Sequence, residues 1–151
     1  MQSRSQQKLR EHRERAALKA VEAELDDLRS ADGTPLRPGE EPEWVAEAIE
    51  RAFSVHTDPT DRLPDDASPQ HLDAWLDRLL STNGLTGRLH VRTHLGIHPW
   101  LEIDAPAPGW TARLRDAIEE PWMFLSGACD TLLIVSEAEY FYEAYVCRRP
   151  A

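Results

Sequence analysis

The sequence predicts an α+β fold in which an antiparallel sheet of four to five strands, ending in a C-terminal meander, packs on two or three helices. Two observations favour this class. Apolar residues recur every three or four positions in the first half of the 151-residue chain, and nearer to every second position after Gly87. Helical segments therefore come before strand segments, without the regular strand–helix alternation and glycine-rich first turn of nucleotide-binding α/β folds.

The first predicted element is a helix within residues 1–30, which contain no Gly or Pro. The second half of this helix has one apolar stripe, whereas the first half is polar on every side and basic. We therefore expect the first half to project from the rest of the chain. The stripe offers a short surface through which two copies could pair as a homodimer. It consists of Leu18, Val21, Leu25 and Leu28, and the basic residues are Arg4, Lys8, Arg10, Arg13, Arg15 and Lys19.

A linker rich in Gly, Pro and acid is predicted over residues 31–41, followed by one domain over residues 42–151. Apolar spacing in this domain predicts helices over 43–55 and 68–81, the second with Ser68 as its N-cap. The run from Thr57 to Ala67, rich in Pro and Asp, reads as a loop between them.

The remaining elements are mostly strands. Alternation predicts strands over 88–95 and 100–103, then a short helix near 110–118 and three β-rich runs at 122–125, 131–136 and 140–147. Short connections between the last three runs favour an antiparallel meander. The Ser136-x-x-Glu139 pattern also resembles a capping box, so a final helix stays open as an alternative to the last strand.

Charge is unevenly distributed along the chain. There are 17 Lys+Arg and 27 Asp+Glu, a formal net charge of −10, yet residues 1–20 hold six basic and only two acidic residues. The acidic remainder argues against nucleic-acid binding by the body, so only residues 1–20 are candidates for it. The longest apolar run is too short to span a bilayer, and no N-terminal apolar segment resembles a signal peptide. We therefore expect a cytoplasmic location without membrane contact.

No recognisable catalytic motif or cofactor-binding motif is present. His90, His94 and His98 recur every four residues, but residues four apart on a strand are about 13 Å apart, which disfavours a shared metal ion. Acidic doublets read as solvated surface charge, and Cys129 and Cys147 read as reduced thiols. We expect no cofactor and no metal.

These observations favour a non-catalytic intracellular protein-binding module, such as an adaptor, inhibitor or immunity-type protein. Its partner is expected to be a protein, and a basic one would suit an acidic surface that contains aromatic residues. The candidate partner-binding residues are Trp100 and Trp122, expected to be partly exposed because each follows a Pro, together with Tyr140, Tyr142, Glu137 and Glu139.

Two alternatives stay open. One is a small enzyme or anionic-ligand-binding domain with a cleft lined by His90, Arg92, His94 and Glu102. The other is a nucleic-acid-associated protein that uses the basic N-terminal arm.

Overall fold

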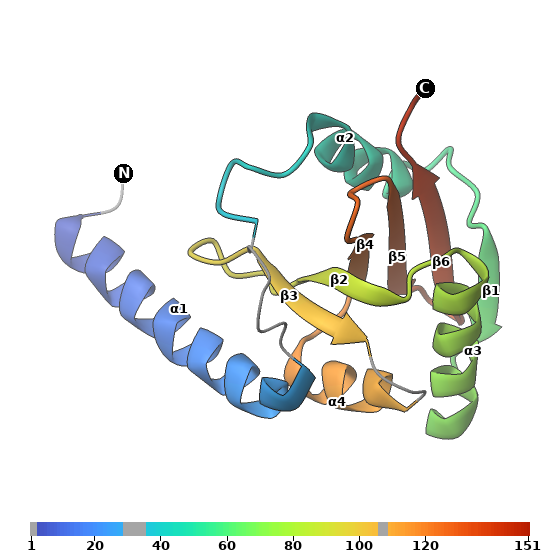
Figure 1. The fold of residues 1–151 in the computed structure, drawn as a ribbon, viewed down its shortest axis with the longest axis horizontal. Helices are drawn as coiled ribbons and strands as arrows, with labels where there is room; N and C mark the ends of the chain where they lie inside the picture. Colours follow the sequence, from blue (N-terminus) through green and yellow to red (C-terminus); the bar gives the residue numbers. More distant parts are fainter. Residues whose placement is uncertain (1–2, 29–35, 106–108) are drawn as a thin grey trace.

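The computed structural model describes residues 3–28, 36–105 and 109–151, and these residues form a six-stranded antiparallel sheet with helices (Figure 1). The predicted α+β class is confirmed, but the sheet has more strands than the four to five expected. The helices are α1 (Arg4–Glu24), α2 (Glu43–Ala52), α3 (Pro69–Thr82) and α4 (Trp110–Ala117), with a 3-10 turn η1 (Asp26–Leu28). The strands are β1 (Asp61–Pro64), β2 (Gly87–Arg92), β3 (Trp100–Ala105), β4 (Trp122–Ser126), β5 (Thr131–Glu137) and β6 (Phe141–Arg148).

The strand order is β1-β6-β5-β4-β2-β3, and every neighbouring pair is antiparallel. The C-terminal meander is therefore confirmed, and the last element is a strand rather than a helix. The prediction of a loop over residues 57–67 is wrong in part, because β1 pairs along the edge of β6 with Asp61 opposite Ala144. Edge strands tolerate Pro and charge, so their local composition resembles that of a loop.

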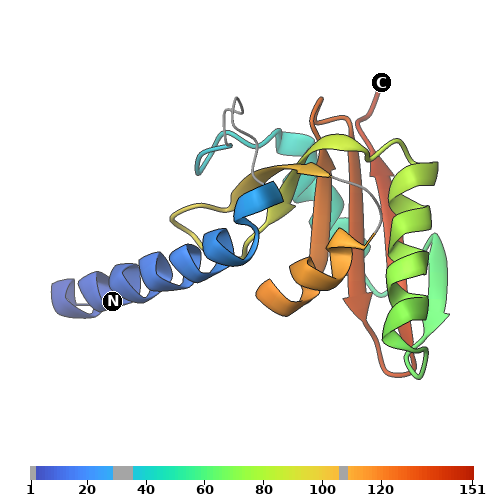
Figure 2. The ribbon, with the colours of Figure 1, turned by 60° about the horizontal axis from the view of Figure 1, so that its bottom comes forward.

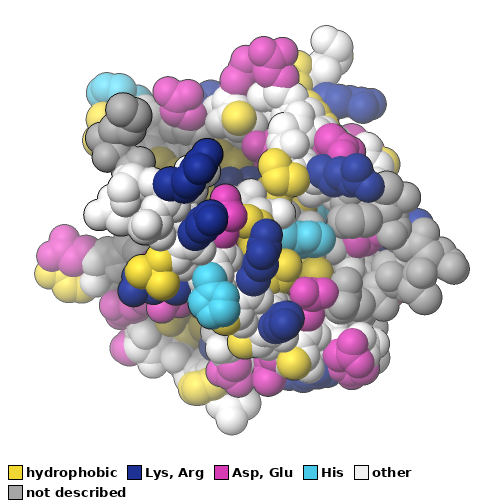
Figure 3. Space-filling view, turned by 90° about the vertical axis from the view of Figure 1, so that its left-hand side faces the viewer, with side chains coloured by type: hydrophobic (Ala, Val, Ile, Leu, Met, Phe, Trp, Pro, Cys, Tyr) yellow, Lys and Arg dark blue, Asp and Glu magenta, His cyan; other side chains and the backbone are white. Residues whose placement is uncertain are grey.

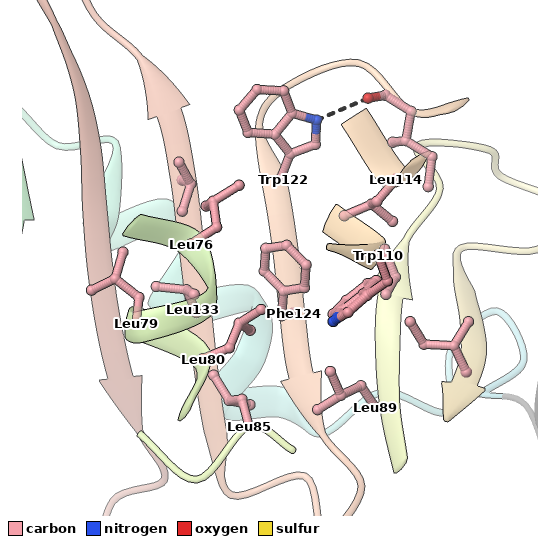
Figure 4. Packing of buried hydrophobic residues seen from close by; sticks show 14 of the residues in the cluster. Leu76, Leu79, Leu80, Leu85, Leu89, Trp110, Leu114, Trp122, Phe124 and Leu133 are labelled. Carbon is pink, nitrogen blue, oxygen red and sulfur yellow. Dashed lines mark hydrogen bonds between the residues drawn. The ribbon is translucent and has the colours of Figure 1, made fainter. Parts of the chain in front are cut away.

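Helices cover both faces of the sheet. Trp44, Val45 and Ala48 of α2 pack with Leu125 and Ile134 on one face. On the other face, leucines of α3 and the side chains of Trp110 and Leu114 in α4 surround Phe124 and Leu133 (Figure 4). The central strands β4 and β5 are therefore buried on both sides. The two helices predicted for the body, α2 and α3, lie on opposite faces of the sheet.

The N-terminal helix docks onto the body through its C-terminal end, and its N-terminal half projects away (Figures 1 and 2). Val21, Leu25 and Leu28 are buried in the core cluster that includes α3 and α4. The prediction that this stripe is open for pairing between copies is therefore wrong for these three residues. The helix ends at Glu24 rather than continuing to residue 30, and Arg113 Nη1 donates to Asp27 Oδ2 at 2.8 Å in the turn that follows.

Part of the predicted linker, residues 31–35, and the last two residues of the predicted helix lie outside the described residues. Within the described ranges, no helix combines the length and the apolar content that crossing a bilayer would need.

Candidate functional site

Aromatic and acidic side chains meet at the end of the sheet where β5 turns into β6. Tyr140 is 67% exposed and Phe141 is 39% exposed. The guanidinium carbon of Arg62, on the neighbouring edge strand, lies 5.8 Å from the centre of the Phe141 ring. The backbone N–H of Asp65 donates to the Tyr140 carbonyl at 3.0 Å, so the loop between β1 and α3 lies beside this turn.

Carboxylates from three separate parts of the sequence act on Tyr142: Glu137 ends β5, Asp65 follows β1 and Glu120 follows α4. Glu120 Oε2 accepts a hydrogen bond from the backbone N–H of Glu137 at 3.0 Å, which ties the α4–β4 connection to the end of β5. Burial raises the pKa of the Tyr142 hydroxyl, and the negative charges of Glu137, Asp65 and Glu120 raise it further, while Arg115 opposes them. The phenol therefore lies in a negative local field, to which distant parts of the sequence contribute.

These carboxylates have no cationic partner among the described residues. No Lys or Arg nitrogen lies within ion-pair distance of them, whereas the acids of the neighbouring helices and strands include several that are paired. We call this surface the acidic hairpin end. It consists of Tyr140, Tyr142, Asp65, Asp66, Glu119, Glu120, Glu137 and Glu139.

The two predicted tryptophans are not part of this surface. Trp100 is 0% exposed and Trp122 is 7% exposed, so the expectation of partial exposure is wrong for both. A buried indole needs an acceptor for its N–H, and each finds one inside the fold. Trp122 Nε1 donates to the Ile118 carbonyl at 2.8 Å, and Trp100 Nε1 donates to Glu41 (Figure 4 shows the first of these).

The structure brings together only two of the four residues of the alternative ligand site. His90 and Glu102 are directly opposite on β2 and β3, on the same face of the sheet, and both are buried. Among the described residues, neither His90 Nδ1 nor Glu102 Oε1 has a hydrogen-bond partner, although Arg88 Nε lies 3.0 Å from that oxygen as an ion pair. Burial lowers the pKa of His90 and raises the pKa of Glu102.

Arg92 and His94 lie in other surroundings, so the predicted cleft of four residues is not formed. Arg92 Nη1 donates to Glu41 Oε2 at 3.1 Å, and its guanidinium lies 5.3 Å from the centre of the Trp100 ring. His94 lies past the end of β2 with a φ of 65°, and its Nε2 is 2.8 Å from the Pro121 carbonyl oxygen. A cation already bound to a carboxylate is a poor receptor for an anionic ligand.

The structure favours neither a metal site nor a nucleophilic cysteine among the described residues. The described residues contain no group of three His, Cys, Asp or Glu side chains arranged to hold a metal ion. Burial and the charge of Asp130 raise the pKa of the Cys129 thiol, the opposite of the shift that activates a nucleophilic cysteine. The expected reduced thiols are consistent with the two free, half-buried cysteines.

The basic side chains predicted for the N-terminal arm are exposed on α1. None of them forms an ion pair with a described residue. Figure 3 shows Lys and Arg side chains gathered near a His on the side of the molecule from which α1 projects. The basic residues of the arm are Arg4, Lys8, Arg10, Arg13, Arg15 and Lys19.

Sequence reasoning missed the contribution of Asp65 and Glu120 to the acidic hairpin end. Each belongs to an acidic doublet that is visible in the sequence, but a doublet in a loop ordinarily indicates solvated charge. The signal that was lacking is their convergence, which follows from the strand order rather than from any local pattern.

Comparisons with protein-family models, with curated proteins and with solved structures gave no match for this chain. What the chain does is therefore inferred from the geometry of its described residues.

Proposed function

We propose that this chain is a non-catalytic protein-binding module that receives a basic partner protein at the acidic hairpin end. The observation that carries the proposal is a set of carboxylates, one at the end of β5 and two in loops, that have no ion-pair partner among the described residues and that raise the pKa of the Tyr142 hydroxyl, near the exposed side chain of Tyr140. Such a module would act as an adaptor, an inhibitor or an immunity-type protein.

Unpaired like charges that are held close together repel one another and do not stabilise a fold. A Lys or Arg side chain from a partner would relieve that repulsion and form charge-assisted hydrogen bonds with Asp65, Glu120 or Glu137. Tyr140 would supply the rigid aromatic contact that protein interfaces favour. Complementary charge would also speed the encounter with a basic partner.

We place this role in the cytoplasm. Cys129 and Cys147 are both free thiols. Free thiols are kept reduced in the cytosol, whereas oxidising compartments favour disulfides.

The test is affinity purification from the native host with the full chain as bait, followed by calorimetric titration of the partner that is captured. We expect a basic protein to be retained by the wild-type chain and to bind the Glu137→Lys/Glu139→Lys variant at least about tenfold more weakly, since tenfold corresponds to about 1.4 kcal/mol. The matched control is Glu47→Lys/Glu50→Lys, which makes the same charge change at two exposed positions of α2.

Retention of the partner by the control and its loss by the hairpin variant would support the proposal. Equal binding by both variants, or equal loss, would show that the acidic hairpin end is not the receptor. Urea midpoints for all three proteins establish that each is folded at the temperature of the titration.

A further inference from the structure

Four of the basic residues of α1 lie on one side of the helix. At 3.6 residues per turn, Arg4, Lys8, Arg15 and Lys19 fall within an arc of about 60° and extend about 22 Å along the axis. We call these four residues the basic stripe. All four are exposed, and none forms an ion pair with a described residue.

The body holds α1 through another side of the helix, and Arg15 and Lys19 of the stripe are exposed although they line a hollow of about 320 Å³. Val21 and Leu25 are buried against the body, and their mean direction lies about 110° around the helix from the centre of the basic stripe. Farther along the helix, Glu14 Oε1 accepts a hydrogen bond from the backbone N–H of Gly96 at 2.6 Å. The helix is therefore fixed at two levels, and Lys and Arg side chains are displayed on its free surface (Figure 3).

Acidic residues interrupt this side of the helix only at its margin. Glu11 lies at the edge of the arc and Glu22 lies inside it near the docked end, and both are half-buried. Glu11 is a surface neighbour of Lys8 and Arg15, three and four residues away, whereas Arg4 has no acidic residue three or four positions from it.

We infer that the basic stripe binds the phosphate backbone of duplex DNA without reading its sequence. A row of Lys and Arg about 22 Å long spans about six base-pair steps, since each strand carries one phosphate per 3.4 Å of axis. Neutralising phosphates in this way is what non-specific DNA binding requires. An α-helix also fits the surface of B-form DNA better than that of duplex RNA, whose major groove is deep and narrow.

The composition of α1 disfavours a membrane or an acidic protein as the partner of the basic stripe. Helices that lie on membranes pair a basic face with large apolar or aromatic residues, and Leu9 is the large apolar residue exposed on the projecting half of α1. Protein interfaces are anchored by Trp, Tyr and Arg, and α1 contains Arg but no Trp, Tyr or Phe that would supply an apolar anchor.

The acidic body does not prevent this contact because the stripe extends away from it. Glu14 contacts the body at Gly96, and Arg4 precedes Glu14 by about 15 Å of helix, whereas the Debye length at 0.1 M salt is about 10 Å. The repulsion between DNA and the body is therefore screened most strongly at the N-terminal end of the stripe.

The test is fluorescence anisotropy with a labelled DNA duplex of about 20 base pairs and the full chain at several salt concentrations. Four phosphate contacts predict a slope of log K against log salt of about −3.6, which is about a 150-fold loss of affinity between 50 and 200 mM salt. In Lys8→Gln/Arg15→Gln the slope should fall to about −1.8, since each lost contact removes about 0.9.

The matched control is Arg10→Gln/Arg13→Gln. It removes the same charge from the same helix, but each position lies about 150° from the centre of the basic stripe, so we expect an unchanged slope. Gln is a good helix former, and circular dichroism verifies the helix in both variants.

Three results would overturn the inference. They are absence of saturable DNA binding at low salt, an equal change in slope for the two double variants, and tighter binding to duplex RNA or to phosphatidylserine vesicles than to duplex DNA. A fourth would be a dimer in sedimentation of the chain alone that Lys8→Gln/Arg15→Gln abolishes, because a second copy would then occupy the stripe.

Discussion

Replacing Leu25 with Ala removes a side chain that holds α1 on the body. Leu25 is 0% exposed and belongs to the core cluster that also contains Trp110 and Leu114 of α4. Truncating a fully buried Leu typically lowers the free energy of unfolding by about 2–5 kcal/mol, through lost transfer energy and the cavity left behind. Because 1 kcal/mol shifts the melting temperature of a domain of this size by about 2–4 °C, a loss of about 3 kcal/mol predicts a decrease of about 6–12 °C.

The assay is thermal unfolding followed by circular dichroism at two protein concentrations about a hundredfold apart. We expect the Leu25→Ala decrease to be the same at both concentrations, because the contact lies within one chain. Leu18→Ala is the control: it belongs to the same apolar stripe but is only half-buried, so its effect should be smaller. A concentration-dependent melting temperature, or a larger effect at Leu18, would mean that the stripe pairs with a second copy.

Four further substitutions test other parts of the fold. Burial lowers the pKa of His90 in the folded chain, so the unfolded chain takes up a proton first as the pH falls below about 6.5, and the free energy of unfolding decreases there. His90→Gln should remove that part of the pH dependence of the urea midpoint. A plot of midpoint against pH with the same slope as the wild type would refute this. A Cβ on Gly127 would lie 2.8 Å from the Arg88 carbonyl oxygen, so Gly127→Ala should lower the free energy of unfolding by about 1–3 kcal/mol in urea titrations. Gly96→Ala, which meets only the flexible Glu14 carboxylate at 3.4 Å, should be milder, and the reverse order would contradict the packing. Ser68→Ala removes the hydroxyl that accepts the His71 N–H at 3.1 Å and should lower the unfolding free energy by about 1 kcal/mol; an unchanged midpoint would show that this cap contributes nothing.

The helices could be predicted closely because their signals are local. Ser68 and Pro69 mark the start of α3 in both the sequence and the structure, and the apolar spacing of α2 gives its buried face. The position of β1 could not be predicted in this way, because four residues rich in Asp and Pro become a strand only when β6 offers an edge to pair with. Its stability comes from that pairing rather than from local propensity.

The arrangement of helices on both faces had a signal that alternation alone does not reveal. Residues 122–126 and 131–135 are apolar or small at nearly every position, and every one of them is buried. Continuous apolar strands are typical of sheets that are covered on both sides. In a strand with one solvent-exposed face, apolar and polar residues alternate. The Pro-Trp pairs gave a wrong prediction of partial exposure for a related reason. The indole N–H groups of Trp100 and Trp122 donate to acceptors within the fold, so both side chains can be buried.

The residues of the candidate site that lie in the β5–β6 turn could be predicted from the sequence, but the approach of distant residues to that turn could not. Glu137, Glu139 and Tyr140 lie in one short turn, so a local pattern is enough to group them. Asp65 and Glu120 are far from that turn in sequence and join it because β1 and β5 both flank β6 and because Glu120 accepts from the Glu137 N–H. Pairing between distant strands is the information that one sequence does not contain.

The acidic hairpin end and the basic stripe are close enough to influence each other at low salt. Glu119 and Glu120 line the same cleft, of about 400 Å³, as Ala17 and Val21 of α1. The cleft lies on the other side of the helix from the stripe, but a helix is only about 10–12 Å across and the Debye length reaches about 30 Å at 0.01 M salt, so at low salt these carboxylates repel an anion at the docked half of the stripe. A basic partner at the acidic hairpin end would neutralise them and thereby strengthen DNA binding.

This coupling rests on both proposals and has a definite sign. Glu119→Gln/Glu120→Gln should tighten DNA binding at low salt, and bound partner should do the same. The partner must in turn bind more tightly in the presence of DNA by an equal factor, because binding linkage is reciprocal. Both effects should vanish as the salt concentration rises, which separates electrostatic coupling from a change in the position of α1. An unchanged DNA affinity in the Gln variant at low salt would mean that the two surfaces act independently, since those carboxylates line a cleft together with α1.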